Sequence, residues 1–387
     1  MKTIGVYLAV PPHYGGAYQY NMSLIRALES LAGTFRLVAF LADEEWTEML
    51  PESFDQICKP RTFFMKTMEK IWRTFDCSKM RYKRAAARFN PVVRAINESG
   101  CDLVIFPSHD TLSYCTSKKS LATIHDLMHR YEGHFEEYQN GEYEKREKLF
   151  SNMCGEVSGI LVDSEVGKIQ VLESYDVEVG KVFVLPFVPP YYLLEGKYVD
   201  VGKKYGLPDK YLFYPAQFWE HKNHFALLVA LRTLVDEGLD VNLVLAGSKK
   251  NNYEKVMDEI KRLRLKERVF VIGYVSNDEM YSLYKKALAL TFVSMIGPTN
   301  IPPLEAMLLG CPAIVSNVYA MPEQVEDAAL LVDPRDPVDI AEKIERIWKD
   351  GSLREELAEK GLRKISSYGQ DQFTSKLKNI ISVVLEN

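Results

Sequence analysis

The chain has 387 residues, of which 47% are apolar and 26% are charged, and its formal net charge is −5. This length is about two and a half times that of a typical domain, so it predicts two domains, and the composition excludes a disordered, collagen-like or coiled-coil chain. No apolar run reaches the ~18 residues of a membrane-spanning helix. The six cysteines show no CxxC pair and no metal-ligand spacing. We therefore expect a cytoplasmic protein from a reducing compartment.

Short apolar runs alternate with helical periodicity along the whole chain. The first run, residues 3–10, precedes Pro11 and Pro12 instead of a small-residue cleavage site, so we interpret it as a strand and not as a signal peptide. In the first half we expect strands at residues 3–10, 35–41, 103–106, 122–124, 160–162 and 182–185. In the second half we expect strands at residues 211–214, 241–245, 269–272, 288–292, 313–315 and 329–332. Helical periodicity covers residues 18–31, 224–235, 253–263, 277–287, 337–348, 353–365 and 370–385.

These strands are continuous apolar runs, which suit parallel strands that are buried on both faces. Strand–helix alternation in both halves predicts an α/β protein with two doubly wound, Rossmann-like domains. Closely spaced prolines at residues 186–190 mark the boundary, so we expect domains at 1–189 and 190–369. The helix at 370–387 has no strand to follow it and is expected to pack on the first domain. Ligands of such sheets bind beyond the carboxyl ends of the strands, so we expect a site in a cleft between the domains.

The segment from Lys59 to Arg88 has a strong positive charge. It holds ten basic and two acidic residues, a net +8, so the remainder of the chain carries −13. Aromatic and methionine side chains are mixed with these charges. Two interpretations stay open: a solvated helix that covers its own domain, or a surface that meets anionic lipid head groups. We expect no nucleic-acid partner.

The most specific motif is SMIGPTNIPPLEA at residues 294–306. A buried strand leads into a loop, and Thr299 or Asn300 is placed to cap a helix that Pro302 and Pro303 open. Free N–H groups at such a helix start favour a diphosphate. Glu305 is expected in the first turn, where its carboxylate can accept hydrogen bonds from two sugar hydroxyls. The alternative is an acid that is favoured there by the helix dipole alone.

This motif resembles that of the retaining nucleotide-sugar glycosyltransferases of the GT-B fold, glycosyltransferase family 4. The resemblance covers nearly the whole chain and is strongest between residues 211 and 339. It implies that Glu305 is the second glutamate of an E-x7-E motif and binds the donor ribose. The first glutamate would stand at Gly297, so here the sequence departs from the family, and Thr299, Asn300 and Ile301 are expected beside the donor sugar.

A second match is PAQFWEHKN at residues 215–223. The family aims an arginine and a lysine at the donor diphosphate. Lys222 takes the place of the lysine, and Gln217 stands where the arginine would be. The resemblance assigns Lys222 to catalysis and Gln217 to donor binding; the alternative is an ordinary solvated lysine.

The first domain gives two further matches. Gly15 and Gly16 close the loop after the first strand, and the resemblance places them near the donor phosphate; the alternative is a generic turn. His125, in the stretch ATIHD, is expected to contact the donor sugar or its phosphate, with Asp126 orienting the imidazole. The alternative for His125 is a structural histidine.

Weaker signals lie at other strand ends. Gly247 is expected near the phosphates, and Tyr274 and Val275 near the nucleotide base. The turn Asp163-Ser164-Glu165 is interpreted as a helix cap.

The resemblance implies transfer of a hexose from a UDP- or GDP-linked sugar, with retention, to a saccharide or lipid-linked acceptor in bacterial cell-surface polysaccharide synthesis. It implies a donor-binding second domain and an acceptor-binding first domain. No D-x-D motif is present, so no metal and no cofactor is expected, and the diphosphate would be neutralised by Lys222 and the helix start near Glu305. Two alternatives remain. Gln217 and Gly297 allow a catalytically silent binding module, and the same fold also serves nucleotide-sugar epimerases and inverting transferases.

Overall fold

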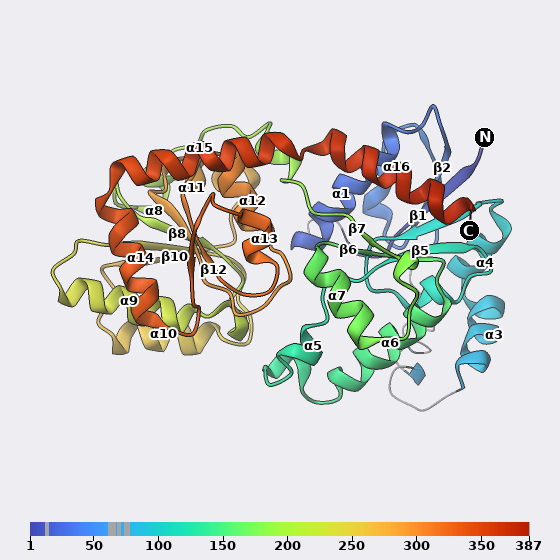
Figure 1. The fold of residues 1–387 in the computed structure, drawn as a ribbon, viewed down its shortest axis with the longest axis horizontal. Helices are drawn as coiled ribbons and strands as arrows, with labels where there is room; N and C mark the ends of the chain where they lie inside the picture. Colours follow the sequence, from blue (N-terminus) through green and yellow to red (C-terminus); the bar gives the residue numbers. More distant parts are fainter. Residues whose placement is uncertain (12–14, 61–66, 68–70, 73–77, 387) are drawn as a thin grey trace. The chain divides into compact units, whose positions relative to one another are not determined.

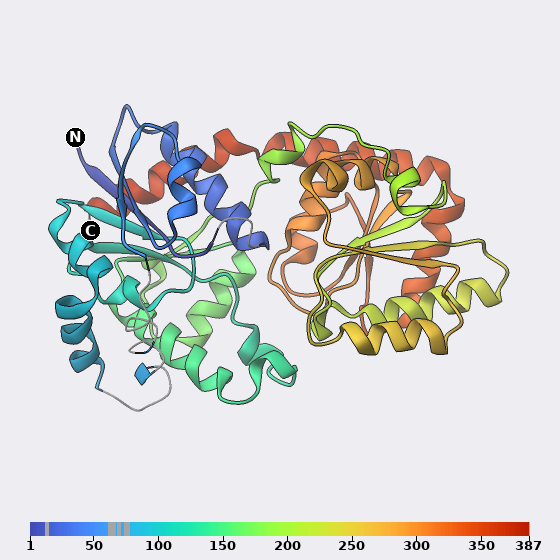
Figure 2. The same ribbon diagram turned by 180° about the vertical axis from the view of Figure 1, so that it is seen from behind.

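The computed structural model describes residues 1–11, 15–60, 67, 71–72 and 78–386. The chain divides into two units. The first comprises Met1–Phe187 together with Gln370–Asn387, and the second comprises Val188–Gly369. Each unit is an α/β body built on its own parallel sheet (Figures 1 and 2).

The first unit contains a seven-stranded sheet in the order β3-β2-β1-β4-β5-β6-β7, and all of its strand pairs are parallel. The strands are β1 (Thr3–Leu8), β2 (Arg36–Leu41), β3 (Phe54–Cys58), β4 (Leu103–Phe106), β5 (Lys119–Thr123), β6 (Gly159–Val162) and β7 (Val182–Val184). β4 and β6 are buried at every position, as expected for strands covered on both faces. The strand order reverses between β1 and β4, which is where doubly wound sheets bind ligands.

Helices cover both faces of this sheet. They are α1 (Gly15–Glu29), α3 (Lys79–Phe89), α4 (Pro91–Glu98), α5 (Met128–Tyr131), α6 (Glu142–Glu156), α7 (Glu165–Ser174) and α16 (Gln370–Glu386). α16 lies beside α1 (Figures 1 and 2) and buries one apolar stripe that begins at Phe373. The C-terminal helix therefore packs on the first unit, as predicted. Lys119 Nζ donates hydrogen bonds to the backbone oxygens of Val384 and Leu385, 3.2 and 2.8 Å away, at the end of this helix.

The second unit contains a six-stranded parallel sheet in the order β10-β9-β8-β11-β12-β13. The strands are β8 (Leu212–Pro215), β9 (Leu243–Ala246), β10 (Val269–Gly273), β11 (Ala289–Phe292), β12 (Ala313–Ser316) and β13 (Leu330–Val332). The helices are α8 (Val201–Tyr205), α9 (His224–Asp236), α10 (Tyr253–Arg262), α11 (Asn277–Lys286), α12 (Ile301–Leu308), α13 (Met321–Val325), α14 (Pro337–Lys349) and α15 (Gly351–Ser367). Its strand order reverses between β8 and β11, so this unit has a switch point of its own.

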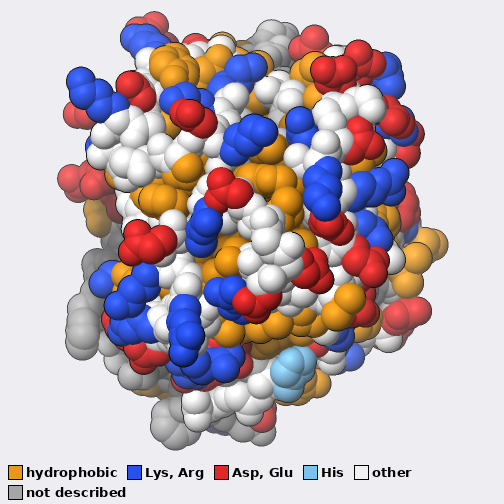
Figure 3. All heavy atoms as spheres, turned by 90° about the vertical axis from the view of Figure 1, so that its left-hand side faces the viewer, with side chains coloured by type: hydrophobic (Ala, Val, Ile, Leu, Met, Phe, Trp, Pro, Cys, Tyr) orange, Lys and Arg blue, Asp and Glu red, His pale blue; other side chains and the backbone are white. Residues whose placement is uncertain are grey.

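The exposed helices of the second unit pair their own charges. Figure 3 views the face over α9, α10 and α14, where basic and acidic side chains are interspersed. Ion pairs one turn apart join Arg232 to Asp236, Arg262 to Glu259, and Lys343 to Asp339. Such pairs suit solvated helix surfaces.

The expected architecture of two doubly wound α/β units is confirmed, with two local differences. β3 was not predicted from the sequence, and α1 begins at Gly15, which was expected in a loop. Fourteen of the 30 residues from Lys59 to Arg88 lie outside the described residues, and four of the ten basic side chains, Arg61, Lys66, Lys70 and Arg73, are among them. In the described part of the chain, none of the helices is both long and apolar enough to cross a bilayer.

Candidate functional site

In the second unit, the predicted donor-site residues gather where β8 and β11 end. The loop after β8 carries Lys222, and the loop after β11 carries Asn300. Lys222 Nζ lies 3.2 Å from Asn300 Oδ1 and 3.4 Å from Ser294 Oγ, and it also lies over the Phe292 ring. The ammonium group is thereby directed to the edge where the strand order reverses, and it is not an ordinary solvated lysine.

Both backbone polar groups of Asn300 form hydrogen bonds with the Gln324 side chain. Its backbone N–H donates to Gln324 Oε1 at 3.1 Å, and its carbonyl accepts from Gln324 Nε2 at 2.7 Å. Asn300 is the residue before α12, but its side chain makes no cap hydrogen bond. The expected capping role is therefore wrong for Asn300, because its amide oxygen accepts from Lys222 instead.

The start of α12 offers fewer donors than the sequence interpretation assumed. Pro302 and Pro303 occupy the second and third helical positions and have no N–H. Ile301 is the one residue among the first three that can donate a backbone hydrogen bond. An anion at this helix start would depend on Ile301 and on Lys222, and not on a full cluster of N–H groups.

Gly297 has a backbone conformation that explains the missing glutamate. Its φ is +112°, and a Cβ at this position would lie 2.5 Å from Asn300 Nδ2. A glutamate would be strained, and it would push the Asn300 side chain away from Lys222. Thr299, between the two, is half-buried.

Glu305 lies in the second turn of α12, not in the first as expected, so stabilisation by the helix start does not account for it. The side chain is buried, with 6% of its surface exposed. Tyr192 donates to Glu305 Oε1 at 2.9 Å, and Tyr284 donates to Oε2 at 2.7 Å. Burial raises the pKa of Glu305, and the two phenol hydrogen bonds act against that rise.

Neither tyrosine was singled out in the sequence. Tyr284 lies in α11, and Tyr192 lies in a single helical turn at Tyr191–Leu193. The signal available for Tyr284 was its position on the inner side of a predicted helix, since it is fully buried. Tyr192, the second of two consecutive tyrosines after Pro189 and Pro190, gave no comparable signal.

The loop after β8 packs closely against the end of β9. A Cβ on Gly247 would lie 2.2 Å from the carbonyl oxygen of Ala216, so only glycine fits at this position. Gln217 is exposed, and its Oε1 accepts from Trp219 Nε1 at 2.9 Å. After β10, the Tyr274 side chain is 74% exposed, while Val275 is buried. Tyr274 is therefore available to a ligand through its ring, and Val275 only through its backbone.

In the first unit, a cavity of about 280 Å³ lies at the other switch point. It is lined by Ala9, Val10, Ala17, Ser108, His109, Asp110 and His125. These residues follow β1, β4 and β5, or lie in the first turn of α1. Gly15, with a φ of +58°, is the first residue of that helix, and Gly16 is the second.

His125 reaches this cavity, but Asp126 is not the group that holds its ring. His125 Nε2 lies 2.9 Å from the carbonyl oxygen of Pro107. Its backbone N–H donates to His109 Nε2, also at 2.9 Å. Asp126 Oδ1 instead binds Arg146 Nη1 at 2.8 Å and the backbone N–H of Met128 at 3.0 Å. The expected orienting role of Asp126 is therefore wrong, and the Pro107 carbonyl takes it.

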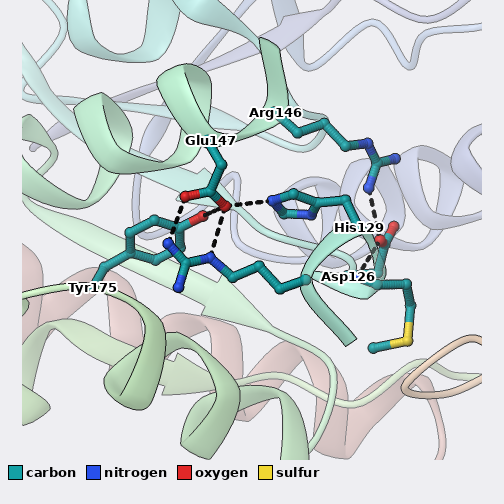
Figure 4. A network of polar contacts seen from close by, with 7 residues as sticks. Asp126, His129, Arg146, Glu147 and Tyr175 are labelled. Atoms are coloured by element: carbon teal, nitrogen blue, oxygen red, sulfur yellow. Dashed lines mark hydrogen bonds and ion pairs between the residues drawn. The ribbon is translucent and has the colours of Figure 1, made fainter. Parts of the chain in front are cut away.

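A polar network joins the residues that follow His125 to α6 and to Tyr175 at the end of α7 (Figure 4). Glu147 Oε1 is 2.7 Å from His129 Nε2 and 2.6 Å from Arg130 Nε, and it accepts from the Tyr175 hydroxyl at 3.1 Å. Burial lowers the pKa of His129, which favours the neutral ring. Although burial opposes the shift, hydrogen bonds from Arg130, His129 and Tyr175 lower the pKa of Glu147. Asp126 and Glu147 are thus balanced by Arg146 and Arg130.

The remaining expected positions are structural. Ser164 Oγ accepts from the backbone N–H of Gly167 at 3.0 Å, which makes it the cap of α7, as interpreted. Within the described residues, there is no group of three or more His, Cys, Asp or Glu side chains that could hold a metal ion.

A family of known proteins matches most of the second unit. Residues 202–364 match the family model described as "Glycosyl transferases group 1". The matched residues make up most of the second unit. The glycosyltransferase resemblance found in the sequence is therefore confirmed for the unit that carries Lys222, Asn300 and Glu305.

Two proteins that this chain resembles are named as O-antigen chain mannosyltransferases. Mannosyltransferase B of Escherichia coli is 28% identical over 183 residues, which cover 47% of this chain and 48% of the relative. RfbU of Salmonella typhimurium is 22% identical over 326 residues, which cover 83% of this chain and 84% of the relative. The chain thus matches about half the length of the first relative and most of the second.

Solved structures show the same fold over the full length. HepE of Anabaena, in complex with UDP and glucose, superposes with a TM-score of 0.74 at 14% identity, covering 99% of this chain and 100% of that chain. WaaG, a glycosyltransferase involved in lipopolysaccharide biosynthesis, gives a TM-score of 0.69 at 15% identity, covering 98% and 99%. The predicted GT-B fold is confirmed.

Proposed function

We propose that the protein is a retaining glycosyltransferase that moves a hexose from a UDP- or GDP-linked sugar to a saccharide or lipid-linked acceptor. The observation that carries the proposal is the position of Lys222 Nζ beside Asn300, at the switch point of the family's own unit. Two relatives are named as O-antigen mannosyltransferases, which favours mannose from GDP-mannose and a role in bacterial cell-surface polysaccharide synthesis.

The proposed chemistry uses charge stabilisation. When the bond between the sugar C1 and the diphosphate breaks, negative charge develops on the departing diphosphate, and the Lys222 ammonium group stabilises it. The acceptor oxygen forms the new bond to C1, and its proton passes to the departing diphosphate. Ile301 N–H and the Asn300 amide are the neighbouring donors. Glu305 is the proposed ribose ligand, and His125 the proposed contact to the donor sugar.

The test measures binding and transfer separately on the full chain. Thermal shift with UDP and GDP identifies the nucleotide, since a ligand of the folded state raises the melting temperature. Transfer from the matching sugar nucleotide is then followed with and without a metal chelator. Lys222→Met is expected to weaken nucleotide binding by about tenfold or more, equivalent to ~1.4 kcal/mol. Lys266→Met, on an exposed lysine, is the control.

The outcomes separate the alternatives. Retained configuration in the product supports the proposal, and inverted configuration favours an inverting transferase. Nucleotide binding without transfer or donor hydrolysis favours a silent binding module, which Gln217 and Gly297, in the places of the family's arginine and glutamate, motivate. Conversion of the sugar nucleotide without an acceptor favours an epimerase.

An anionic membrane surface is part of the same proposal for a lipid-linked acceptor. α3 carries five basic residues and no acidic one, and its Met80 and Phe89 side chains are more than half exposed. Lys79 and Lys83 are already paired with Glu156. Co-sedimentation with anionic vesicles, and not with neutral ones, is expected, and Arg81→Glu with Arg84→Glu should abolish it.

A further inference from the structure

The cavity in the first unit has neutral and acidic walls. Among the residues that line it, His109, Asp110, His125 and Ser108 carry polar side chains, and there is no lysine or arginine. Asp110 is buried, and its Oδ1 accepts from the backbone N–H of Leu112 at 2.8 Å. A carboxylate in the wall disfavours a phosphate or another anion. The cavity volume is close to the ~300 Å³ at which small-molecule sites begin.

The hydrogen bonds of His125 define which of its nitrogens carries a proton. Nε2 faces the Pro107 carbonyl oxygen at 2.9 Å, and a carbonyl can only accept. Nε2 is therefore the N–H of the ring. In the neutral imidazole, Nδ1 then keeps its lone pair and is an acceptor.

His109 has the opposite arrangement. Its Nε2 accepts the backbone N–H of His125 at 2.9 Å, so Nε2 keeps its lone pair. The proton of the neutral ring is on Nδ1, which is a donor. Burial lowers the pKa of both histidines, that of His109 strongly, and this keeps both rings neutral.

Two neighbouring imidazoles thus offer one donor and one acceptor. Their ring centroids lie 5.3 Å apart, and both rings line the cavity. A hydroxyl group can accept one hydrogen bond and donate another, whereas a phosphate dianion can only accept. The pair therefore matches the chemistry of a sugar hydroxyl.

We propose that His109, together with His125, binds a hydroxyl group of a neutral saccharide in this cavity, with His109 Nδ1–H donating to the hydroxyl and His125 Nδ1 accepting from it. This inference rests on the proposed transferase function, for which the saccharide is a substrate. It makes His109 a specificity-determining residue of the first unit.

The first test reads the protonation of each ring directly. The full chain is labelled with ¹⁵N-histidine, its seven histidines are resolved by single substitutions, and spectra are recorded at neutral pH. We expect the proton on Nδ1 of His109 and on Nε2 of His125. Methyl α-mannopyranoside should shift the Nδ1 signals of both residues and leave those of the exposed His134 unchanged. Inorganic phosphate should shift neither.

The second test uses two variants of His109. His109→Gln keeps an acceptor for the His125 N–H and a donor for the ligand, so the saccharide-induced shift at His125 should persist. His109→Phe keeps a ring but removes both nitrogens, so that shift should disappear. If the phenylalanine variant does not fold, wild type and His109→Gln still decide the question.

Three results would overturn the inference: reversed protonation of the two rings, a response to phosphate in place of the saccharide, or no response to either. Binding of UDP or GDP to the second unit is measured on the same samples. Intact nucleotide binding with an inert cavity rejects this inference alone. Absent nucleotide binding rejects the proposed function.

Discussion

The Tyr192 hydroxyl lies 2.9 Å from Oε1 of Glu305, a carboxylate that is buried and already accepts a hydrogen bond from Tyr284. The two phenols supply the hydrogen bonds that water would otherwise make. Without them, ionised Glu305 would have little compensation for its burial.

Tyr192→Phe is expected to lower the free energy of unfolding by about 1–2 kcal/mol at neutral pH, because one hydrogen bond to a buried carboxylate is lost. The pKa of Glu305, which burial already raises, should rise further. The destabilisation should shrink as pH falls and Glu305 becomes protonated. Urea unfolding at neutral and acid pH measures both effects. Tyr198→Phe, in the same segment and 59% exposed, is the control; an equal effect of both changes would contradict the prediction.

Placing the family's glutamate at Gly297 should not improve nucleotide binding or the proposed transfer. The positive φ costs a side-chain-bearing residue about 1–2 kcal/mol, and the new Cβ displaces the Asn300 amide from Lys222. Gly297→Glu should therefore weaken binding of the nucleotide and slow transfer. Gly297→Ala adds the Cβ without the carboxylate. It should lower the free energy of unfolding by about as much as Gly297→Glu does. Faster transfer by the glutamate variant would show that the loop adapts.

Glu147→Gln tests the polar network shown in Figure 4. The change removes the charge that pairs with Arg130 and replaces one accepting oxygen by an NH₂ group, so we expect a loss of about 2 kcal/mol. Glu156, which binds Lys79 and Lys83, is a matched control, because its side chain is 25% exposed and that of Glu147 is 23% exposed. Glu156→Gln should cost less than about 1 kcal/mol. Thermal unfolding compares the two, and similar losses would show that the network acts like surface ion pairs.

The burial of His224 should make the free energy of unfolding depend on pH. Burial lowers its pKa to about 3, and neither ring nitrogen has a hydrogen-bond partner in the described residues. Its contribution to stability is complete above the unfolded-state pKa of about 6.5 and is lost as pH falls towards 3. The loss should reach ~2 kcal/mol by about pH 5.

His224→Phe should remove that loss, since the ring stacks on Phe218 without needing its nitrogens. The variant should match wild type in urea at pH ~8 and exceed it at pH ~5. His134→Gln, at an exposed position, is the control. Equal sensitivity of wild type and His224→Phe to acid would contradict the prediction.

The fold could be predicted because apolar runs locate buried parallel strands. β4 was predicted with the bounds that the structure has, since all four of its residues are buried. β3 was not predicted because it lies at the sheet edge and only Phe54 of its five residues is buried, so no apolar run marks it.

The site was predicted only in part. Lys222 and Asn300 stand in motifs, so the sequence brought them together. Tyr192 and Glu305 are 113 positions apart, and their hydrogen bond arises from tertiary packing that no local pattern encodes. His109 escaped for a related reason: its role depends on the backbone N–H of His125, which has no sequence signature.

The place of α16 in the chain has a consequence for biosynthesis. This helix completes the first unit by packing on α1 with its buried face, yet its codons follow those of the whole second unit. A nascent chain that has emerged as far as Phe187 still lacks the cover for the α1 surface around Tyr20, whose ring lies 6.5 Å from that of Phe373. The first unit, although it is translated first, therefore cannot complete its packing until the last helix of the chain has been made.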